Sequence, residues 1–325
     1  MGGKIDFSKW IETNFGVDTD TFIEVLEMSP SSQGGIQGAV SELELFRYLI
    51  GSGYDAWRIK EKPAGGFDEK KDGYKGDFLI KDHAGEYYVV ECKGIKTNAE
   101  FRGGDTGDDF IKSITREQAF NTLKKYINID KERIYEKGLK AYEKKKADWE
   151  AKHLGETYPP FTWTHEHPGP DSPDLTQIFP TLQSLHEYID SLDESRFSEQ
   201  AFRKHFGAFV MMQTHKPNRR KDPETGESIA APLASDFSIL AVDLFQRTGK
   251  HQFVFVNPDT ISHSPEYPNH LYQNYTIDIL IPGKKDNLDI VFPWFIDIEL
   301  CIKATQPRTV AYDESQLDHR EDQNN

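Results

Sequence analysis

Cysteine is scarce in this chain of 325 residues, because only Cys92 and Cys301 are present. Two cysteines exclude a framework of several disulfides and favour a reducing compartment. Long apolar runs are also lacking: no stretch reaches the roughly 20 apolar residues that a membrane-spanning helix needs, and the opening MGGKIDFSKW has no apolar segment typical of a secretion signal. The formal net charge of −15 argues against a protein that holds nucleic acid by overall charge alone. We therefore expect a cytoplasmic protein that makes no contact with a membrane.

Hydrophobic residues make up 37% of the chain, enough for a sizeable core. Apolar residues at three- and four-residue intervals predict a helix over 37–50, with Val40, Leu43 and Phe46 among its core-facing residues. The same criteria predict further helices over 108–127 and 131–153 and around 196–212. Alternating or continuous apolar runs predict strands over 54–60, 77–81, 87–92, 236–245, 252–258, 275–283 and 293–303.

The most informative stretch is GDFLIKDHAGEYYVVECKG, residues 76–94. It predicts two antiparallel strands, with Asp77 at the start of the first and Glu91 at the end of the second. Those two ends are adjacent in such a hairpin, and Glu91 and Lys93 face the same side of a strand because they are two residues apart. Charges that end the apolar run YYVV are costly to bury unless they are paired or bind a metal.

Two carboxylates and an ammonium at one sheet edge suit phosphodiester hydrolysis. Mg²⁺ takes one or two carboxylates, several waters and substrate phosphate oxygens. A water bound to the ion ionises more easily, and Lys93 could position it or neutralise the phosphate in the transition state. The backbone carbonyl of Cys92, between Glu91 and Lys93, could be a further ligand. The alternative is an ordinary solvated salt bridge, which such a trio forms in most proteins.

These residues resemble the motifs of the PD-(D/E)XK nuclease superfamily. The matching segments are GD at 76–77 with the apolar FLI, and YYVVECKG at 87–94. The family places an Asp on one strand, a Glu-x-Lys at the end of the next, and a helix carrying a Glu before them. The order of elements through 37–127 is similar. One departure is Gly76, where the family has Pro.

The resemblance implies an α/β fold with a restriction-endonuclease-like core: a central mixed β-sheet flanked by helices. It implies that Asp77 and Glu91 are metal ligands, that Lys93 is the catalytic lysine, and that Glu42 is the helix carboxylate holding a metal or its water. Glu44 is the other candidate for that last role. It also implies Mg²⁺ as cofactor, double-stranded DNA as substrate and, because type II restriction endonucleases act on palindromic sites, a homodimer.

Basic residues in two segments are candidates for DNA contacts. The run within 214–228 stands out in an acidic chain and could neutralise phosphates. Asn, Gln, His, Arg and Tyr in loops between 247 and 275 are residue types that read base edges, although any loop contains them. The candidate contacts are Lys216, Arg219, Arg220, Lys221, Arg247 and Lys250.

Other chemistries have weaker support. His165 and His167 form a His-x-His pair without a Cys or His cluster around it, which disfavours zinc. GGIQGAVS lacks the Lys-Ser/Thr ending of a phosphate-binding loop, so no nucleotide cofactor is expected.

We predict a single nuclease domain over 1–311. Its core motifs lie in 37–127 and 236–258, a long helical insertion spans about 128–235, and recognition elements span about 214–228 and 247–305. A polar, disordered tail is expected over 312–325. Two alternatives stay open: another PD-(D/E)XK nuclease for repair, recombination or a phage, and a non-catalytic nucleic-acid-binding protein that kept the fold.

Overall fold

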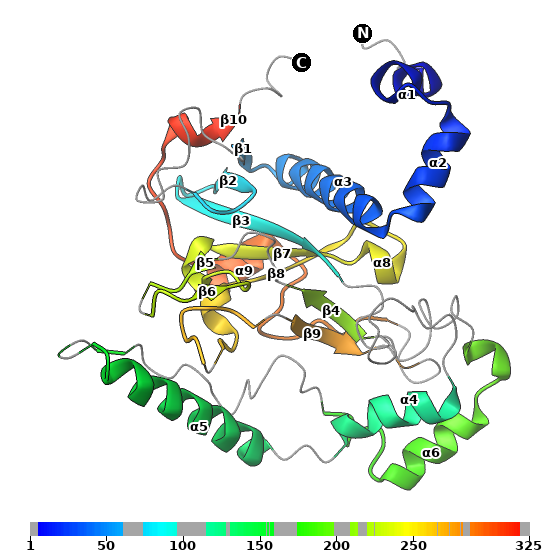
Figure 1. The fold of residues 1–325 in the computed structure, drawn as a ribbon, viewed down its shortest axis with the longest axis vertical. Helices are drawn as coiled ribbons and strands as arrows, with labels where there is room; N and C mark the ends of the chain where they lie inside the picture. The colour runs from blue at the N-terminus through cyan, green and yellow to red at the C-terminus, as the bar shows by residue number, and fades with distance from the viewer. Residues whose placement is uncertain are drawn as a thin grey trace.

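A six-stranded mixed sheet forms the centre of the protein in the computed structural model (Figure 1). Its strand order is β10-β1-β2-β3-β7-β8; β3 and β7 are parallel and every other neighbouring pair is antiparallel. The structure describes residues 6–60, 74–95, 115–127, 131–153, 155, 157–158, 174–197, 209–213, 220–223, 225–264, 266–272, 274–279, 281 and 287–318.

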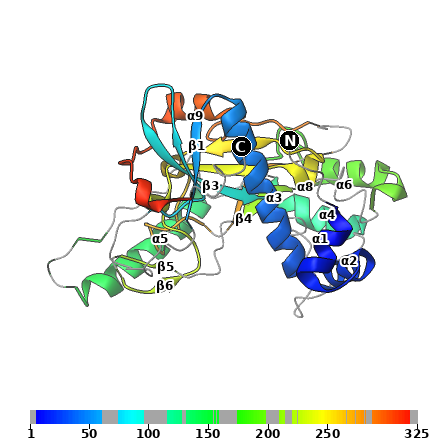
Figure 2. The ribbon, with the colours of Figure 1, turned by 90° about the horizontal axis from the view of Figure 1, so that it is seen from above.

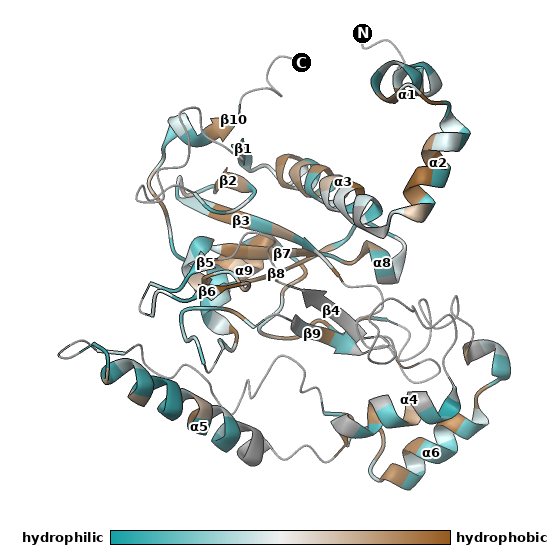
Figure 3. Cartoon of the chain, in the orientation of Figure 1, coloured by the Kyte–Doolittle hydropathy of each residue, from teal (hydrophilic) through white to brown (hydrophobic). Residues whose placement is uncertain are grey.

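The strands of this sheet are β1 (Asp55–Ile59), β2 (Phe78–Lys81), β3 (Tyr87–Gly94), β7 (Ile239–Asp243), β8 (Phe253–Val256) and β10 (Leu317–Asp318). The predicted strands over 54–60, 77–81, 87–92 and 252–258 are thus confirmed to within two residues at each end, and the strand over 236–245 is confirmed for 239–243. Residues 239–256 lie in the same sheet as 78–94, because β3 pairs with β7 and β7 with β8. Figure 3 shows why β7 and β8 were readable from local sequence: both are continuously hydrophobic.

Helices α3 (Pro30–Gly51) and α9 (Ile298–Thr305) cover one face of the sheet. Leu45 and Leu49 of α3 are fully buried against Val90 and Phe255. The predicted core face of this helix is partly wrong, since Val40, Leu43 and Ile50 are exposed. The helix is apolar on more than one side, so periodicity alone could not select the stripe that meets the sheet.

The chain before α3 forms two short helices, α1 (Phe7–Phe15) and α2 (Thr19–Met28). Figures 1 and 2 both draw them extending away from the sheet. Each begins at an aspartate whose side chain accepts a backbone N–H, Asp6 for α1 and Asp18 for α2. Ile11 is the only buried residue of these two helices. Helix α2 contacts α3.

Loops and short segments cover the other face of the sheet. Val89, Leu240 and Val242 pack there against Phe237, Leu271 and Tyr275. Because side chains alternate along a strand, Glu91 and Lys93 share this face with Val89, whereas Cys92 shares the α3 face with Val90.

A separate hydrophobic cluster holds α4 (Arg116–Leu123) and α6 (Leu182–Ser191) together, with Leu123 and Leu185 fully buried. The predicted helix over 108–127 is therefore confirmed only from Arg116 onward, with 108–114 outside the described residues. Helices were expected to flank the central sheet, but α4 packs against α6 in a cluster separate from the sheet core. The predicted helix over 131–153 is confirmed as α5 (Lys131–Glu150), which is mostly hydrophilic in Figure 3.

The segment 128–235 is not purely helical, which corrects the expected helical insertion. It contains β4 (Phe209–Gln213), paired with β9 (Asn274–Ile279), and a small hairpin of β5 (Arg220–Lys221) and β6 (Ser228–Ile229). The helix expected around 196–212 is wrong over 209–212, which belong to strand β4, and its residues 198–208 lie outside the described residues. The short remaining elements are α8 (Phe245–Thr248), η2 (Lys124–Tyr126), η3 (Glu194–Phe197), η4 (Ala234–Asp236), η5 (Pro258–Thr260) and η6 (Glu314–Gln316).

The strand expected over 293–303 is wrong: this stretch ends in helix α9. Asp297 caps the helix by accepting the N–H of Leu300, and Ile298 and Cys301 are buried one turn apart. A short apolar run cannot by itself distinguish a buried strand from a buried helix. The strand expected over 275–283 is confirmed over 275–279 as part of β9, and residues 280 and 282–283 lie outside the described residues.

The polar tail is ordered as far as Asp318, contrary to expectation. Leu317 is fully buried, and β10 extends the sheet by pairing with β1. Gln316 accepts the N–H of Tyr74 through its side chain and the N–H of Lys60 through its carbonyl. Residues 319–325 lie outside the described residues. Among the helices that the structure describes, none is long and apolar enough to cross a membrane.

Candidate active site

The start of β2 and the end of β3 bring the first two predicted residues together. Phe78 pairs with Val90, and the N–H of Asp77 donates to the carbonyl of Val90, which places Asp77 beside the end of β3. Asp77 Oδ2 accepts the backbone N–H of Cys92 at 2.7 Å. The side chain of Asp77, the residue before β2, is thereby hydrogen-bonded to the backbone of β3 between Glu91 and Lys93.

Gly76 has a structural reason at this point. A Cβ added there would lie 2.6 Å from Val89 Cγ1 and 2.8 Å from the carbonyl oxygen of Val90. The second neighbour is backbone and cannot move aside, so β3 passes too close for any side chain. A proline, which the resembled nuclease motif has at this position, would not fit here.

Glu91 and Lys93 form an ion pair on the sheet face shared with Val89. Lys93 Nζ donates to Glu91 Oε1, and the Glu91 side chain is only 2% exposed whereas that of Lys93 is 20% exposed. Burial by itself lowers the pKa of Lys93, but the carboxylates of Glu91 and Asp77 outweigh it and raise that pKa. Lys93 therefore stays charged at neutral pH, with its ammonium group held by the buried Glu91 carboxylate.

Asp77 is the electrostatically strained member of the group. Burial, followed by the negative charge of Glu91, raises its pKa to about 7, although Lys93 acts in the opposite direction. Glu42 raises it further. A carboxyl group that is half protonated at neutral pH, because it is buried and lies beside other carboxylates, is a group that a cation would ionise.

The structure favours Glu42 over Glu44 as the helix carboxylate. Glu42 lies close enough to influence the pKa values of both Asp77 and Cys92. Its Oε2 accepts a 2.5 Å hydrogen bond from Arg58 of β1. Glu44 instead pairs with the exposed Arg47 one turn along α3.

The donor set fits a hard divalent cation in kind, but the carboxylates do not converge on one point. Among the described residues, no three His, Cys, Asp or Glu side chains form a group that could hold a metal ion. Mg²⁺ does not need three, because one or two carboxylates with waters and phosphate oxygens suffice. The Cys92 carbonyl points to the same side of β3 as its N–H, which is the Asp77 side, since both groups of one strand residue share a side.

The predicted DNA contacts separate into two places. Lys221 is exposed on the β5–β6 hairpin, which Figure 1 draws at the left, away from the arrowhead of β3. Arg220 belongs to the same hairpin, and Lys216 and Arg219 lie outside the described residues. Lys250 is exposed just after α8, and Arg247 lies within α8, which begins two residues after the end of β7 beside β3.

The expected base-reading residues of 247–275 are largely used inside the protein. His263 is buried between the carbonyls of Pro268 and Pro258, and His270 is fully buried against Asp222. Tyr275 donates to the carbonyl of Ser262. These three side chains are buried and hold the loops together, and base readout by the rest of the segment stays a prediction.

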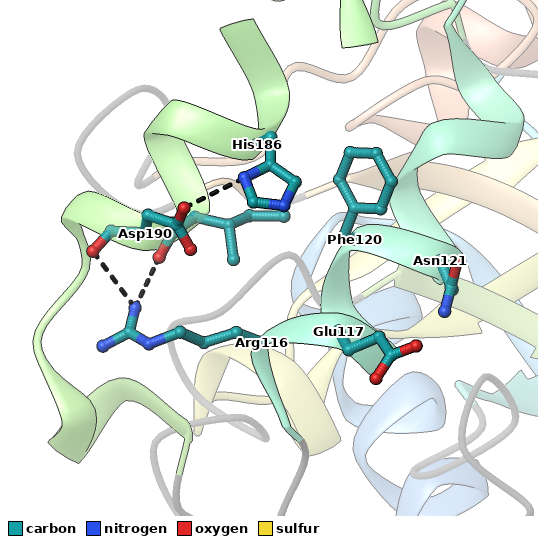
Figure 4. Close-up of a pocket in the computed structure, with 7 residues that line it drawn as sticks. Arg116, Glu117, Phe120, Asn121, His186 and Asp190 are labelled. Atoms are coloured by element: carbon teal, nitrogen blue, oxygen red, sulfur yellow. Dashed lines mark hydrogen bonds and ion pairs between the residues drawn. The ribbon is translucent and has the colours of Figure 1, made fainter. Parts of the chain in front are cut away.

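A pocket of about 500 Å³ lies between α4 and α6 (Figure 4). Its one strong cation, Arg116, donates to the carbonyls of Ile189 and Leu192 and so closes the end of α6. His186 pairs with Asp190 at 2.9 Å on the rim. The polar side chains of the pocket therefore connect α4 with α6. None of the predicted catalytic residues lines it.

Sequence reasoning missed Asp243. Asp243 ends the apolar strand β7, is 1% exposed, and pairs in register with Gly94 at the end of β3. The signal that identified Glu91, a charge directly ending an apolar run, is also present in ILAVD.

Comparison of the chain with family models, curated protein sequences and solved structures finds no significant match.

Proposed function

We propose that this protein is a Mg²⁺-dependent endodeoxyribonuclease with a restriction-endonuclease-like core. The observation that carries the proposal is the placement of Asp77, Glu91 and Lys93 at adjacent strand ends of one sheet. Glu42 reaches the same end from the preceding helix. The antiparallel order β1-β2-β3, followed by a parallel β7, supports the same core.

Asp77, Glu91 and the Cys92 carbonyl would hold the ion, with Glu42 holding it or a water beside it. When bound, the ion makes its water easier to ionise and stabilises negative charge on the phosphate. Lys93 donates hydrogen bonds to the attacking water or to a non-bridging phosphate oxygen, whose charge grows in the transition state. Its raised pKa suits this role, because a permanently charged lysine stabilises an anion and is a poor proton acceptor.

The substrate in this proposal is double-stranded DNA, and the closest functional type is a type II restriction endonuclease acting as a homodimer. A two-fold protein would match a palindromic site. The acidic chain, with a net charge of −15, would bind DNA through local basic groups and the cation rather than through its overall field. The exposed Lys250 near the end of β3 supports such local contact.

One experiment tests the function directly. Purified protein is incubated with plasmid DNA and Mg²⁺, and the ends of the products are sequenced. Identical ends at one short sequence support a restriction endonuclease, whereas heterogeneous ends indicate another nuclease of the superfamily. DNA binding without cleavage at any divalent cation supports the non-catalytic alternative. Sedimentation of the protein with and without DNA then tests the homodimer.

A further inference from the structure

Asp243 is a buried carboxylate that three donors surround. Ser41 Oγ donates to Asp243 Oδ2 at 2.7 Å, and the backbone N–H of Phe245 donates to Oδ1 at 3.0 Å. His251 Nδ1 lies 2.7 Å from Oδ2. Asp243 is 1% exposed, and it is not one of the proposed metal ligands, so its burial needs another explanation.

The contact with Asp243 orients the ring of His251. A carboxylate that accepts from Nδ1 places a proton on that nitrogen and directs Nε2 away from Asp243. The ring also stacks on Phe245, with centroids 4.4 Å apart and an interplanar angle of 9°. The side chain is 25% exposed, and Nε2 is the ring nitrogen that Asp243 leaves for another partner.

The turn that carries His251 is itself well ordered. The N–H of Leu244 donates to the carbonyl of Gln252, and Gly249 closes α8 in the left-handed conformation with φ of 71°. Thr248 Oγ1 donates to the carbonyl of Lys250 at 3.0 Å. The turn therefore fixes His251 beside an exposed cation, Lys250.

This turn belongs to the same end of the sheet as the candidate active site. Asp243 pairs in register with Gly94, the residue after Lys93. Ser41, which donates to Asp243, directly precedes Glu42 on α3. Two hydrogen bonds thus connect His251 to the residue beside the helix carboxylate, with His251 on the α3 side of the sheet and Lys93 on the other.

We propose that His251 is a DNA-positioning residue: with DNA bound, its ring carries a proton on both nitrogens, Nδ1–H donating to Asp243 and Nε2–H to a non-bridging oxygen of a backbone phosphate next to the scissile one. Asp243 positions the ring, and Lys250 adds charge beside it. This inference rests on the proposed nuclease function. A phosphate contact at this turn would seat the duplex over the end of β3 and β7, where a rigid donor positions the backbone without reading its sequence.

The test measures DNA affinity with Ca²⁺ in place of Mg²⁺, so that binding is separated from cleavage. His251→Ala should weaken binding about tenfold, because a hydrogen bond to a charged phosphate is lost. It should also reduce the slope of log affinity against log salt by about one. His251→Arg, which keeps a cation, should retain most of that slope. Under Mg²⁺, the KM of His251→Ala should rise more than its kcat falls.

His186→Ala is the matched control, since His186 is also a histidine paired with a carboxylate but lies on α6. Its salt slope should equal that of the wild type. If His251→Ala lowers the melting temperature but leaves the salt slope unchanged, His251 only supports Asp243 and the inference is wrong. If the wild type cleaves DNA and the His251→Ala variant has the same DNA affinity and salt slope, only this inference is contradicted. Wild-type protein that neither binds nor cleaves DNA overturns the proposed function together with it.

Discussion

The backbone N–H of Cys92 donates a 2.7 Å hydrogen bond to Asp77 Oδ2. This contact makes the direction of the Asp77 carboxylate depend on the register of β2 against β3. It also leaves the neighbouring Cys92 carbonyl facing the same carboxylate. The distance between the proposed ligands is therefore set by the strand pairing itself, and changes to that pairing should affect catalysis.

Replacement of Lys93 separates catalysis from binding. Lys93→Ala should lower cleavage by at least about 100-fold, the usual minimum for a group acting in the transition state, while DNA affinity in Ca²⁺ stays within a few-fold. Because Lys93 pairs with the buried Glu91, Lys93→Ala should also lower stability. Lys93→Gln is the control, since it keeps a donor for Glu91. Cleavage near the wild-type rate in either variant would exclude a catalytic role for Lys93.

A divalent cation should reverse the electrostatics of the site. Without metal, the carboxylate of Glu91 and, where it is ionised, that of Asp77 repel a phosphate by about 1 kcal/mol or more per pair at surface-like dielectric. DNA affinity at constant ionic strength should therefore rise from EDTA to Ca²⁺ without cleavage, and Mg²⁺ should start cleavage.

The double variant Asp77→Asn, Glu91→Gln removes that repulsion. It should bind DNA in EDTA at least as well as the wild type, and it should not cleave in Mg²⁺. Full cleavage by the wild type in EDTA would refute the metal mechanism and leave the two residues as an ordinary charged strand edge.

The pKa of Asp77 predicts how stability changes with pH. Because the folded protein holds this proton up to about pH 7 and the unfolded chain releases it near 3.8, the wild type should lose stability as pH rises through this interval. Asp77→Asn keeps an acceptor for the Cys92 N–H but carries no charge. Its gain in unfolding free energy over the wild type should grow by up to a few kcal/mol between about pH 4 and about pH 8.

Chemical denaturation in EDTA at both pH values measures this difference. Mg²⁺ should stabilise the wild type more at the higher pH, where Asp77 is ionised, and should stabilise Asp77→Asn less. A gain that is equal at both pH values would mean that Asp77 has an ordinary pKa in the folded protein.

Gly76 should not tolerate a side chain. A Cβ at this position meets the Val90 carbonyl at 2.8 Å, so Gly76→Ala should push β2 away from β3 and cost about 1–3 kcal/mol of stability. Cleavage should fall as well, because Asp77 moves with the backbone. Gly94→Ala is the control on the neighbouring strand end, since a Cβ there meets nothing within 4 Å. Equal unfolding midpoints for the two variants would contradict the close approach.

Much of the sheet was readable from the sequence because its strands carry local signals. The runs around Phe78, Val89 and Ile239 are apolar, short and bounded by turn residues, which specifies strands without knowledge of their partners. The closeness of Asp77 and Glu91 could be predicted from the hairpin, because a tight turn makes β3 the strand that pairs with β2. Whether the pair binds a metal stays a prediction.

Elements whose state depends on distant partners were not readable. Residues 209–213 form a strand only because β9 pairs with them, and Leu317 enters the sheet only because β1 offers an open edge. The segment ending in α9 required the cap at Asp297 and a neighbouring core to select helix over strand.

The sequence by itself determined the hairpin of Asp77, Glu91 and Lys93, because the three residues lie within 17 positions and a local turn brings them together. Only the tertiary structure decided that Glu42 rather than Glu44 faces Asp77, because α3 is apolar on several sides and the sheet selects one. The tertiary structure alone also brought Ser41, Asp243 and His251 together, since 202 residues separate Ser41 from Asp243. Contacts across such separations leave no periodic trace in either segment, and packing of the core creates them.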